Sequence, residues 1–301
     1  MFMKTVISFV FLFALAVSFN IQAQSLKPGT KKSTRPAAVK TGAQRPAMPK
    51  GSDFVQEMEH GKINWTDQYI EAEGSSVMDS SRFKLRNQAK LMAQRGAIVD
   101  AQRNLLEIVN GVLVEGQTTV KDLVVESDEV KTKVSGVLKG AVKIGKTTYE
   151  DGVATVRLRI PLYADGLAEA VDTTPAPAPA PVPADPNAPV AQDSIPKQVM
   201  LSVSGTYNPR LFPTLTDSQN KIIWDMAQSF DPTKGKALSI VKQGSGALEA
   251  MKGKKGIELL EVAQDQLGNL VLNDKSKARV EKWKKAGLLI WGLVKKLILP
   301  I

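Results

Sequence analysis

Alanine recurs every fourth residue in the first third of the chain. The repeated positions are Ala89, Ala93, Ala97 and Ala101. Because side chains four residues apart lie on one face of a helix, this spacing predicts a helix over residues 87–112, which Leu105 and Leu106 help to complete. Ser80 or Ser81 is the expected N-terminal cap. The small side chains predict a close approach to a sheet or another backbone.

Strict alternation of apolar and polar residues marks a strand at residues 153–162. Ala154, Val156, Leu158 and Ile160 share one face, and Thr155, Arg157 and Arg159 share the other. Residues 150–152 read Glu-Asp-Gly, a hairpin turn that joins this strand to another at 141–149. Residues 63–65 and 69–72 predict either two short strands or one kinked strand, ending at Gly74.

Two further elements are expected between the long helix and the hairpin. Thr118 to Val125 is rich in β-branched residues and predicts a strand. Ser127 predicts a helix cap, with Asp128 and Glu129 in the first turn and Gly140 as the stop. The fold class is therefore α+β, a small antiparallel sheet covered on one face by a long helix and a shorter helix.

A second, smaller α+β domain is expected after residue 195. Strands are predicted at 199–204 and 221–224, apolar stretches lie at 257–262 and 270–272, and residues 278–285 favour a helix. The segment 235–256 is rich in glycine, serine and lysine and predicts no definite element.

Composition divides the chain into five parts. Residues 1–23 are predicted to be a signal peptide, because a lysine precedes an apolar run that is too short to span a bilayer comfortably; an uncleaved N-terminal anchor is the alternative. Residues 24–52 are predicted to be a disordered basic arm. Residues 172–194 form a Pro/Ala-rich linker in extended conformation. The two domains are therefore 53–171 and 195–301.

The net charge of +10 resides mostly at the two ends of the chain. Residues 24–52 contain seven basic residues and no acidic ones, and residues 273–301 contain eight basic residues and two acidic ones. For an exported protein this distribution favours an anionic envelope surface or acidic protein over nucleic acid, and a solubilising tail is the plainer alternative. The chain has no cysteine, which excludes disulfides, thiolate metal sites and lipid attachment to an N-terminal cysteine.

The sequence predicts no catalytic, cofactor or metal site, and therefore no enzyme. His60 is the only histidine, and with Glu57 it would supply two of the ligands that zinc requires. Ser81-x-x-Lys84 and Ser194-x-x-Lys197 have a serine-lysine spacing but lack the companion motifs of the enzymes that use it.

Two groups of residues are candidates for contacts with other molecules. Arg157 and Arg159 are candidate contacts for a partner or an anion, and a solvated sheet face is the alternative. Trp291, Lys295 and Lys296 are candidate membrane contacts if the apolar tail forms an interfacial helix. Alternatively, the tail completes the core of the second domain. Asp100 and Arg103, one helical turn apart, are expected to pair or cap locally.

The first domain resembles the LPP-twenty-like periplasmic lipoprotein family, which includes flagellar assembly protein P and is similar to the N-terminal domain of flagellar protein T. The resemblance covers residues 63–163, and a weaker echo covers 199–225. It is carried by Ile63-x-Trp65, Ile70-x-Ala72-x-Gly74, Ala97-x-x-Asp100-Ala101-x-Arg103-Asn104-Leu105-Leu106, Thr118-Thr119-Val120-x-Asp122, Gly136-x-Leu138-x-Gly140 and Val156-x-Leu158-x-Ile160-Pro161-Leu162.

The resemblance implies a component of assemblies near the outer membrane that often self-associates, with no catalytic residues. The lipidation cysteine of the family is absent here. The expected function is a non-enzymatic envelope protein of the periplasm or outer-membrane periphery, structural or assembly-related and potentially flagellar, contacting envelope proteins or copies of itself. The alternative is a membrane- or glycan-surface binder that uses the basic arm and the apolar tail.

Overall fold

The long alanine-faced helix forms as the sequence predicts. In the computed structural model, which describes residues 51–172, 196–229, 238–252, 254–285 and 294–300, α1 spans Arg86–Asn110. All four alanines of the repeat are buried. The helix begins later than expected, because the cap position is Leu85 and no side chain caps it. The prediction of a cap at Ser80 or Ser81 is therefore wrong.

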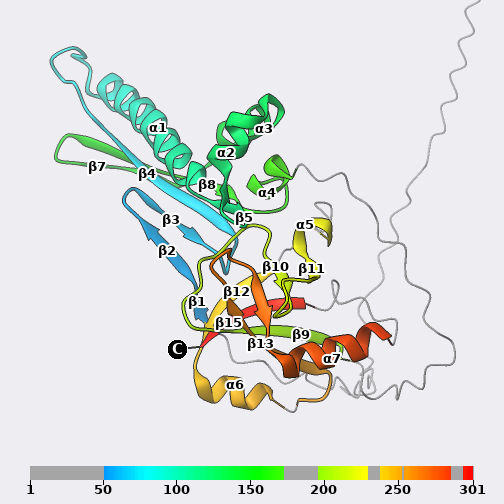
Figure 1. Ribbon diagram of the computed structural model, residues 1–301. Helices are drawn as coiled ribbons and strands as arrows, with labels where there is room; N and C mark the ends of the chain where they lie inside the picture. Colours follow the sequence, from blue (N-terminus) through cyan, green and yellow to red (C-terminus); the bar gives the residue numbers. More distant parts are fainter. Residues whose placement is uncertain (1–50, 173–195, 230–237, 253, 286–293, 301) are drawn as a thin grey trace, which may run out of the picture. The chain divides into compact units, whose positions relative to one another are not determined.

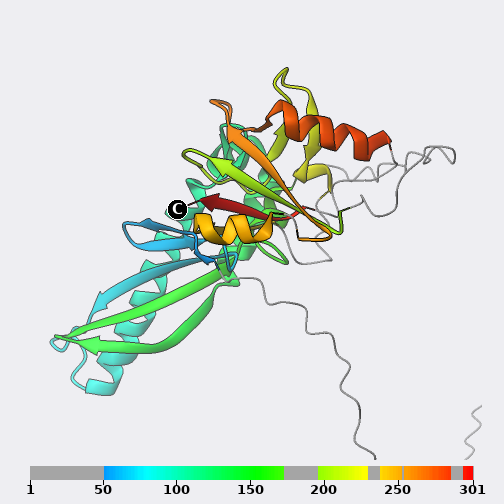
Figure 2. The same ribbon diagram turned by 90° about the horizontal axis from the view of Figure 1, so that it is seen from below.

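A five-stranded antiparallel sheet lies against α1, in the order β2-β3-β4-β8-β7. Its strands are β2 (Val55–Met58), β3 (Gly61–Asn64), β4 (Tyr69–Val77), β7 (Val142–Glu150) and β8 (Val153–Pro161). Figures 1 and 2 show α1 running along β4 and β8 on one face of this sheet. The helix approaches most closely at Gly74, where a Cβ atom would meet the backbone of Ala97 and Ala101. The small residues therefore serve close packing, as expected.

The hairpin β7–β8 confirms the predicted alternation. Ala154, Val156, Leu158 and Ile160 are all at most 3 % exposed, whereas the intervening side chains face away from α1. The turn residues Asp151 and Gly152 both have positive φ, as a type I′ turn requires.

The segment after α1 differs from its prediction. Only β5 (Leu113–Glu115) and β6 (Thr118–Thr119) are strands, and Val120–Glu126 forms helix α2. The prediction of a strand over Thr118 to Val125 is wrong, because Thr119 and Asp122 form a reciprocal capping box that starts a helix. Helix α3 (Asp128–Lys139) follows, capped by the Ser127 hydroxyl as expected.

An eight-stranded mixed sheet contains the strands of the C-terminal part, in the order β1-β12-β15-β9-β13-β14-β10-β11. The strands are β1 (Ser52–Asp53), β9 (Gln198–Ser204), β10 (Thr214–Thr216), β11 (Ile222–Asp225), β12 (Ser239–Gln243), β13 (Ile257–Gln264), β14 (Leu270–Leu272) and β15 (Val294–Pro300). The predicted strands near 199–204 and 221–224 are confirmed. β12, β15, β9 and β13 are mutually parallel. β1 includes the last residue assigned to the basic arm.

Successive residues 199–203 of β9 are all buried, so both faces of this central strand are covered, whereas β13 exposes Glu261 and Ala263. Four short or medium helices complete the fold: α4 (Leu167–Val171), α5 (Met226–Ser229), α6 (Ser245–Met251) and α7 (Asp274–Lys285). α6 packs through Leu248 and Met251 over Met200 and Ile298. The opposite face of the eight-stranded sheet belongs to the main hydrophobic cluster, which also includes Val280 of α7. α7 confirms the helix predicted at 278–285, and β12 and α6 occupy much of the segment to which no element was assigned.

The apolar tail is part of the core over residues 294–300. β15 is inserted between β12 and β9, and Leu297 and Ile298 are completely buried. The interfacial-helix interpretation is therefore wrong for these residues, and the core interpretation is correct. Lys296 is half-buried in this strand. Trp291 lies outside the described residues, as do the segments predicted to be the signal peptide, most of the basic arm and most of the Pro/Ala-rich linker. No described helix is long and apolar enough to cross a bilayer.

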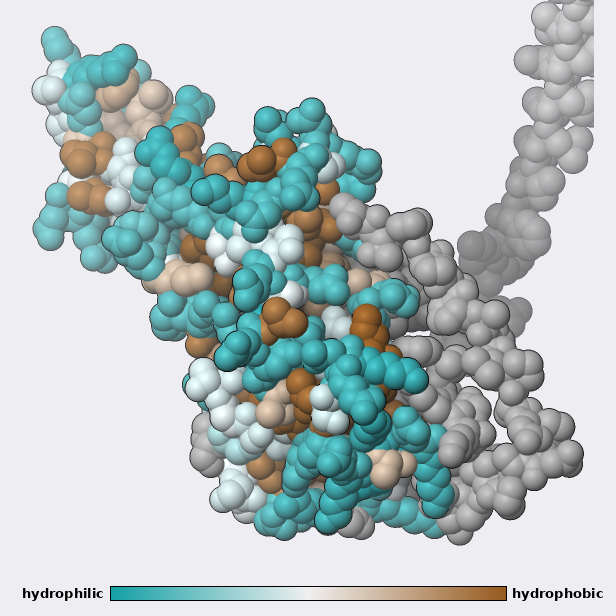
Figure 3. All heavy atoms as spheres, viewed as in Figure 1, coloured by the Kyte–Doolittle hydropathy of each residue, from teal (hydrophilic) through white to brown (hydrophobic). Residues whose placement is uncertain are grey.

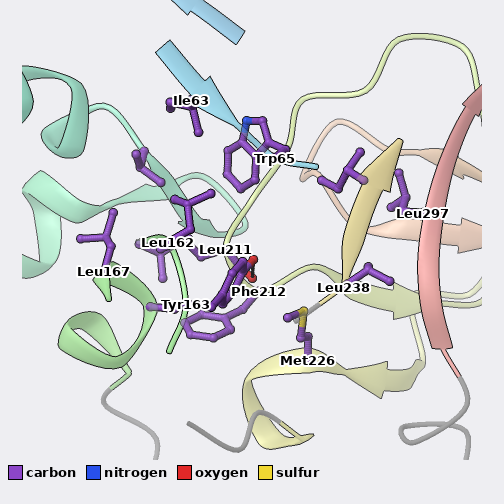
Figure 4. Close-up of a cluster of buried hydrophobic side chains, with 14 of the residues drawn as sticks. Ile63, Trp65, Leu162, Tyr163, Leu167, Leu211, Phe212, Met226, Leu238 and Leu297 are labelled. Carbon is purple, nitrogen blue, oxygen red and sulfur yellow. Dashed lines mark hydrogen bonds between the residues drawn. The ribbon is translucent and has the colours of Figure 1, made fainter. Parts of the chain in front are cut away.

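The two sheets share one hydrophobic cluster, and the described residues belong to one compact unit, Met48–Ile301. Figure 4 shows Trp65, Leu162 and Tyr163 converging on Leu211, Phe212 and Met226. Main-chain hydrogen bonds join Leu211 N–H to Leu113 O (3.0 Å) and Phe212 N–H to Val114 O (2.9 Å). The Tyr163 hydroxyl donates to Leu211 O at 2.7 Å. The segments on either side of the linker therefore pack against one another.

Candidate interaction surface

Charged side chains cover the face of the five-stranded sheet that points away from α1. We call this surface the charged face; it comprises Glu57, Lys62, Glu71, Glu73, Arg157 and Arg159. The strand register aligns Glu57 with Lys62, Lys62 with Glu71, and Glu71 with Arg159. Glu73 is opposite Arg157 in the neighbouring row. Opposite charges thus alternate across the strands, the favourable cross-strand arrangement.

Glu71 lies at the centre of the charged face beneath three cations. Only 6 % of its side chain is exposed. Arg159 donates to Glu71 Oε2 from Nη2 at 2.7 Å and from Nε at 3.1 Å. Arg157 Nη1 lies 3.5 Å and Lys62 Nζ 4.0 Å from Glu71 Oε1. A buried carboxylate needs such partners, because an uncompensated charge away from water is costly.

Arg157 and Arg159, the two predicted contact arginines, therefore differ in how accessible they are to another molecule. The Arg159 guanidinium is paired with Glu71 and also stacks on the Tyr69 ring, 3.7 Å from its centroid. Arg157 makes only the longer contact with Glu71, and 51 % of its side chain is exposed. Both arginines lie on the same wet face, as the alternation predicts. Glu71 engages both arginines, Arg159 more closely than Arg157, and their role as contacts for a partner or an anion stays a prediction.

A groove of about 530 Å³ opens beside Glu71. It lies where β3 begins at Gly61 and β4 continues past Ala72. Its lining includes Glu59, His60, Glu73, Asp100 and Arg157. The pairing of β4 with β3 ends at Ala72, and from Glu73 onward side chains of α1 bind this backbone edge instead. Asp100 Oδ2 accepts the Ser75 N–H at 2.9 Å, and Asn104 Nδ2 donates to Glu73 O at 2.6 Å. The prediction that Asp100 pairs or caps locally is wrong, because its carboxylate accepts a hydrogen bond from the backbone of β4, 25 residues away.

The described residues give no support for chemistry in this groove. They contain no group of three or more metal-ligating side chains. His60 Nε2 lies 3.7 Å from Glu59 Oε1, and both side chains are exposed. The Ser81 hydroxyl donates to Asp79 at 2.6 Å within a local turn, and Ser194 lies outside the described residues. The groove is open and mostly polar, an arrangement suited to surface contacts.

Local sequence patterns do not single out Glu71, Lys62 or Tyr69 as parts of this surface. The alternation Ile70-x-Ala72 contains the signal, because it assigns Glu71 and Glu73 to the wet face of a strand. What the sequence does not reveal is the register of β4 with β8, which brings Glu71 and Arg159 together across 88 residues.

The sequence matches no model of a known protein family and no curated protein. The resemblance to the LPP-twenty-like family thus stays a prediction.

Proposed function

We propose that the protein is a non-enzymatic, exported envelope protein that acts as a structural or assembly module by binding other proteins. The observation that carries this proposal is the charged face. It belongs to a rigid antiparallel sheet whose other face is covered by α1, and it displays alternating charges around the buried Glu71. Such a pattern favours a protein partner with complementary charges, because it gives orientation and specificity over a broad surface.

The location proposed is the periplasm or the outer-membrane periphery. It rests on the lysine and apolar run of residues 1–23, which have the features of a signal peptide. The resemblance to the LPP-twenty-like family supports the same location and suggests envelope proteins, copies of this chain or flagellar components as partners. The alternative, binding to a membrane or glycan surface, now rests on the basic arm, since residues 294–300 of the tail are core.

The proposal is tested with the mature chain, residues 24–301, by light scattering after size exclusion and by fractionation of cells. We expect an oligomer, or recovery with other envelope proteins. Arg157→Glu is expected to weaken that association, because the half-exposed guanidinium of Arg157 becomes an acid beside Glu73. Lys146→Glu, an exposed change on β7, is the matched control and is expected to associate normally.

A strict monomer that is recovered in no envelope fraction would contradict the proposal. Two results together would instead support the surface-binding alternative. Both variants would lose association alike at high salt, and association would require residues 24–50.

A further inference from the structure

Five large apolar side chains are exposed on α1 and its N-cap; Leu91, 49 % exposed, lies beside a row of four that are spaced seven residues apart. The row consists of Leu85 at the helix cap, Met92, Val99 and Leu106, with exposures of 71, 39, 59 and 41 %. We call this row the exposed stripe. Single exposed apolar residues are ordinary on protein surfaces, whereas apolar residues gathered into a patch mark interaction sites.

The exposed stripe is separate from the face that packs in the core. α1 contacts the sheet through its alanines, which approach β4 at Gly74. At 100° per residue, Val99 lies nearly opposite the buried pair Ala97 and Ala101. In Figure 3, hydrophobic patches interrupt the hydrophilic surface in the region of α1. The fold of the described residues therefore leaves the exposed stripe uncovered.

The spacing of the exposed stripe fits a second helix. A seven-residue repeat keeps side chains aligned along the seam between two helices that cross at about 20°. From Leu85 to Leu106 the row extends about 31 Å, the length of a helix of about 21 residues. A partner helix of ordinary length would thus contact all four side chains.

The charges beside the exposed stripe are mostly basic, with the exposed Glu107 next to Leu106 as the acidic exception. Arg95 and Arg103 lie four residues before and after Val99, and both are exposed. Lys84 and Arg86 flank Leu85. The carboxylate of Asp100 is directed to the Ser75 N–H of β4. A helix docked here would therefore meet mostly positive charge along both sides of its apolar contact.

We propose that the exposed stripe binds an amphipathic helix of another protein that carries acidic side chains beside its apolar face. Opposite charges across such a seam select the partner, and like charges reject it. The same rule disfavours two copies of this chain joined through α1, since their arginines would meet. This surface is distinct from the charged face, which lies on the other side of the sheet.

The test uses the mature chain, residues 24–301, and two synthetic helical peptides of about 21 residues. Both carry leucine in an apolar heptad seam; one has glutamate beside the seam and the other has lysine at the same positions. Fluorescence anisotropy at physiological salt is expected to show binding of the glutamate peptide and at least about tenfold weaker binding of the lysine peptide.

Val99→Asp is expected to weaken binding of the glutamate peptide by about tenfold or more, because it adds a like charge in the centre of the contact. Val125→Asp is the matched control: Val125 is also an exposed helical valine, 80 % accessible, but it lies in α2. It is expected to bind as the wild type does. Thermal unfolding of both variants establishes that they are folded.

Equal binding of both peptides, or equal binding by the wild type and Val99→Asp, would overturn the proposal. Co-sedimentation with anionic phospholipid vesicles that Val99→Asp abolishes, without binding of the glutamate peptide, would also overturn it and assign the exposed stripe to a lipid surface.

Discussion

Glu71 determines how the arginines of the charged face are arranged. Replacing it by glutamine leaves Lys62, Arg157 and Arg159 facing a neutral group. We expect Glu71→Gln to reduce the free energy of unfolding by about 2 kcal/mol, less than for a fully buried pair because the cations are partly exposed. Urea denaturation with an unchanged m-value would measure this.

Arg157→Gln serves as the matched control for Glu71→Gln. The Arg157 contact with Glu71 is 3.5 Å and its side chain is half exposed, so the expected loss is below about 1 kcal/mol. If the two variants lost equal stability, Glu71 would not be the centre of the cluster.

Asp217 makes the stability of the C-terminal part depend on pH. An ion pair with Lys277 (2.9 Å) and hydrogen bonds from the backbone N–H groups of Lys221 and Gln219 lower its pKa from 3.8 to about 2. The carboxyl binds a proton more readily in the unfolded chain, so its stabilising contribution is present above pH 4 and lost as the pH falls toward 2. Urea denaturation between pH 5 and pH 2.5 should show a steeper loss for the wild type than for Asp217→Asn. Equal slopes would show that Asp217 contributes nothing to the acid sensitivity.

At the level of elements, the contact between α1 and β4 depends on Gly74. A Cβ atom at this position would lie 2.5 Å from Ala97 O and from Ala101 Cα. Both neighbours are backbone atoms of α1, which cannot move aside as a flexible side chain could. Gly74→Ala is therefore expected to destabilise the fold by about 2 kcal/mol or more, measured by thermal or urea unfolding.

Gly136→Ala is the control for Gly74→Ala. Gly136 lies within α3, and a Cβ atom there would meet nothing within 4 Å. This variant is expected to gain about 0.5 to 1 kcal/mol from helix propensity. Similar losses in both variants would contradict the proposed close approach at Gly74.

Elements whose signals are local were predicted well. The alanine repeat of α1, the Ser127 cap of α3 and the Asp151-Gly152 turn each depend on residues close together in sequence. The prediction for 118–125 failed because β propensity was weighed above the capping signal of Thr119 and Asp122. The sequence does not predict β12 or α6, because a segment rich in glycine and serine has weak secondary-structure propensity. Tertiary packing decides the structure of such a segment.

The arrangement of the charged face was less accessible from sequence. Alternation places Arg157 and Arg159 on a wet face, but their pairing with Glu71 requires the long-range register of β4 and β8. In the same way, the parallel order of β12, β15, β9 and β13 joins distant segments and has no local signal.

At the scale of the whole molecule, the shared core predicts that the two sheets unfold together. Central amides of β4 and β9 should have similar protection in native-state hydrogen exchange, because the same cluster supports both sheets. Tyr163→Phe removes a buried hydrogen bond to Leu211 and should lower the protection of both by about 1 to 2 kcal/mol. A loss confined to one sheet would indicate that the two sheets open independently.

The position of β15 determines when this molecule can fold. Residues 294–300 lie between β12 and β9 in the middle of the eight-stranded sheet, not at its edge. A nascent chain that lacks them has a gap between two parallel strands and an exposed apolar surface. The sheet therefore closes only once residues 294–300 have left the ribosome and can pair with both β12 and β9.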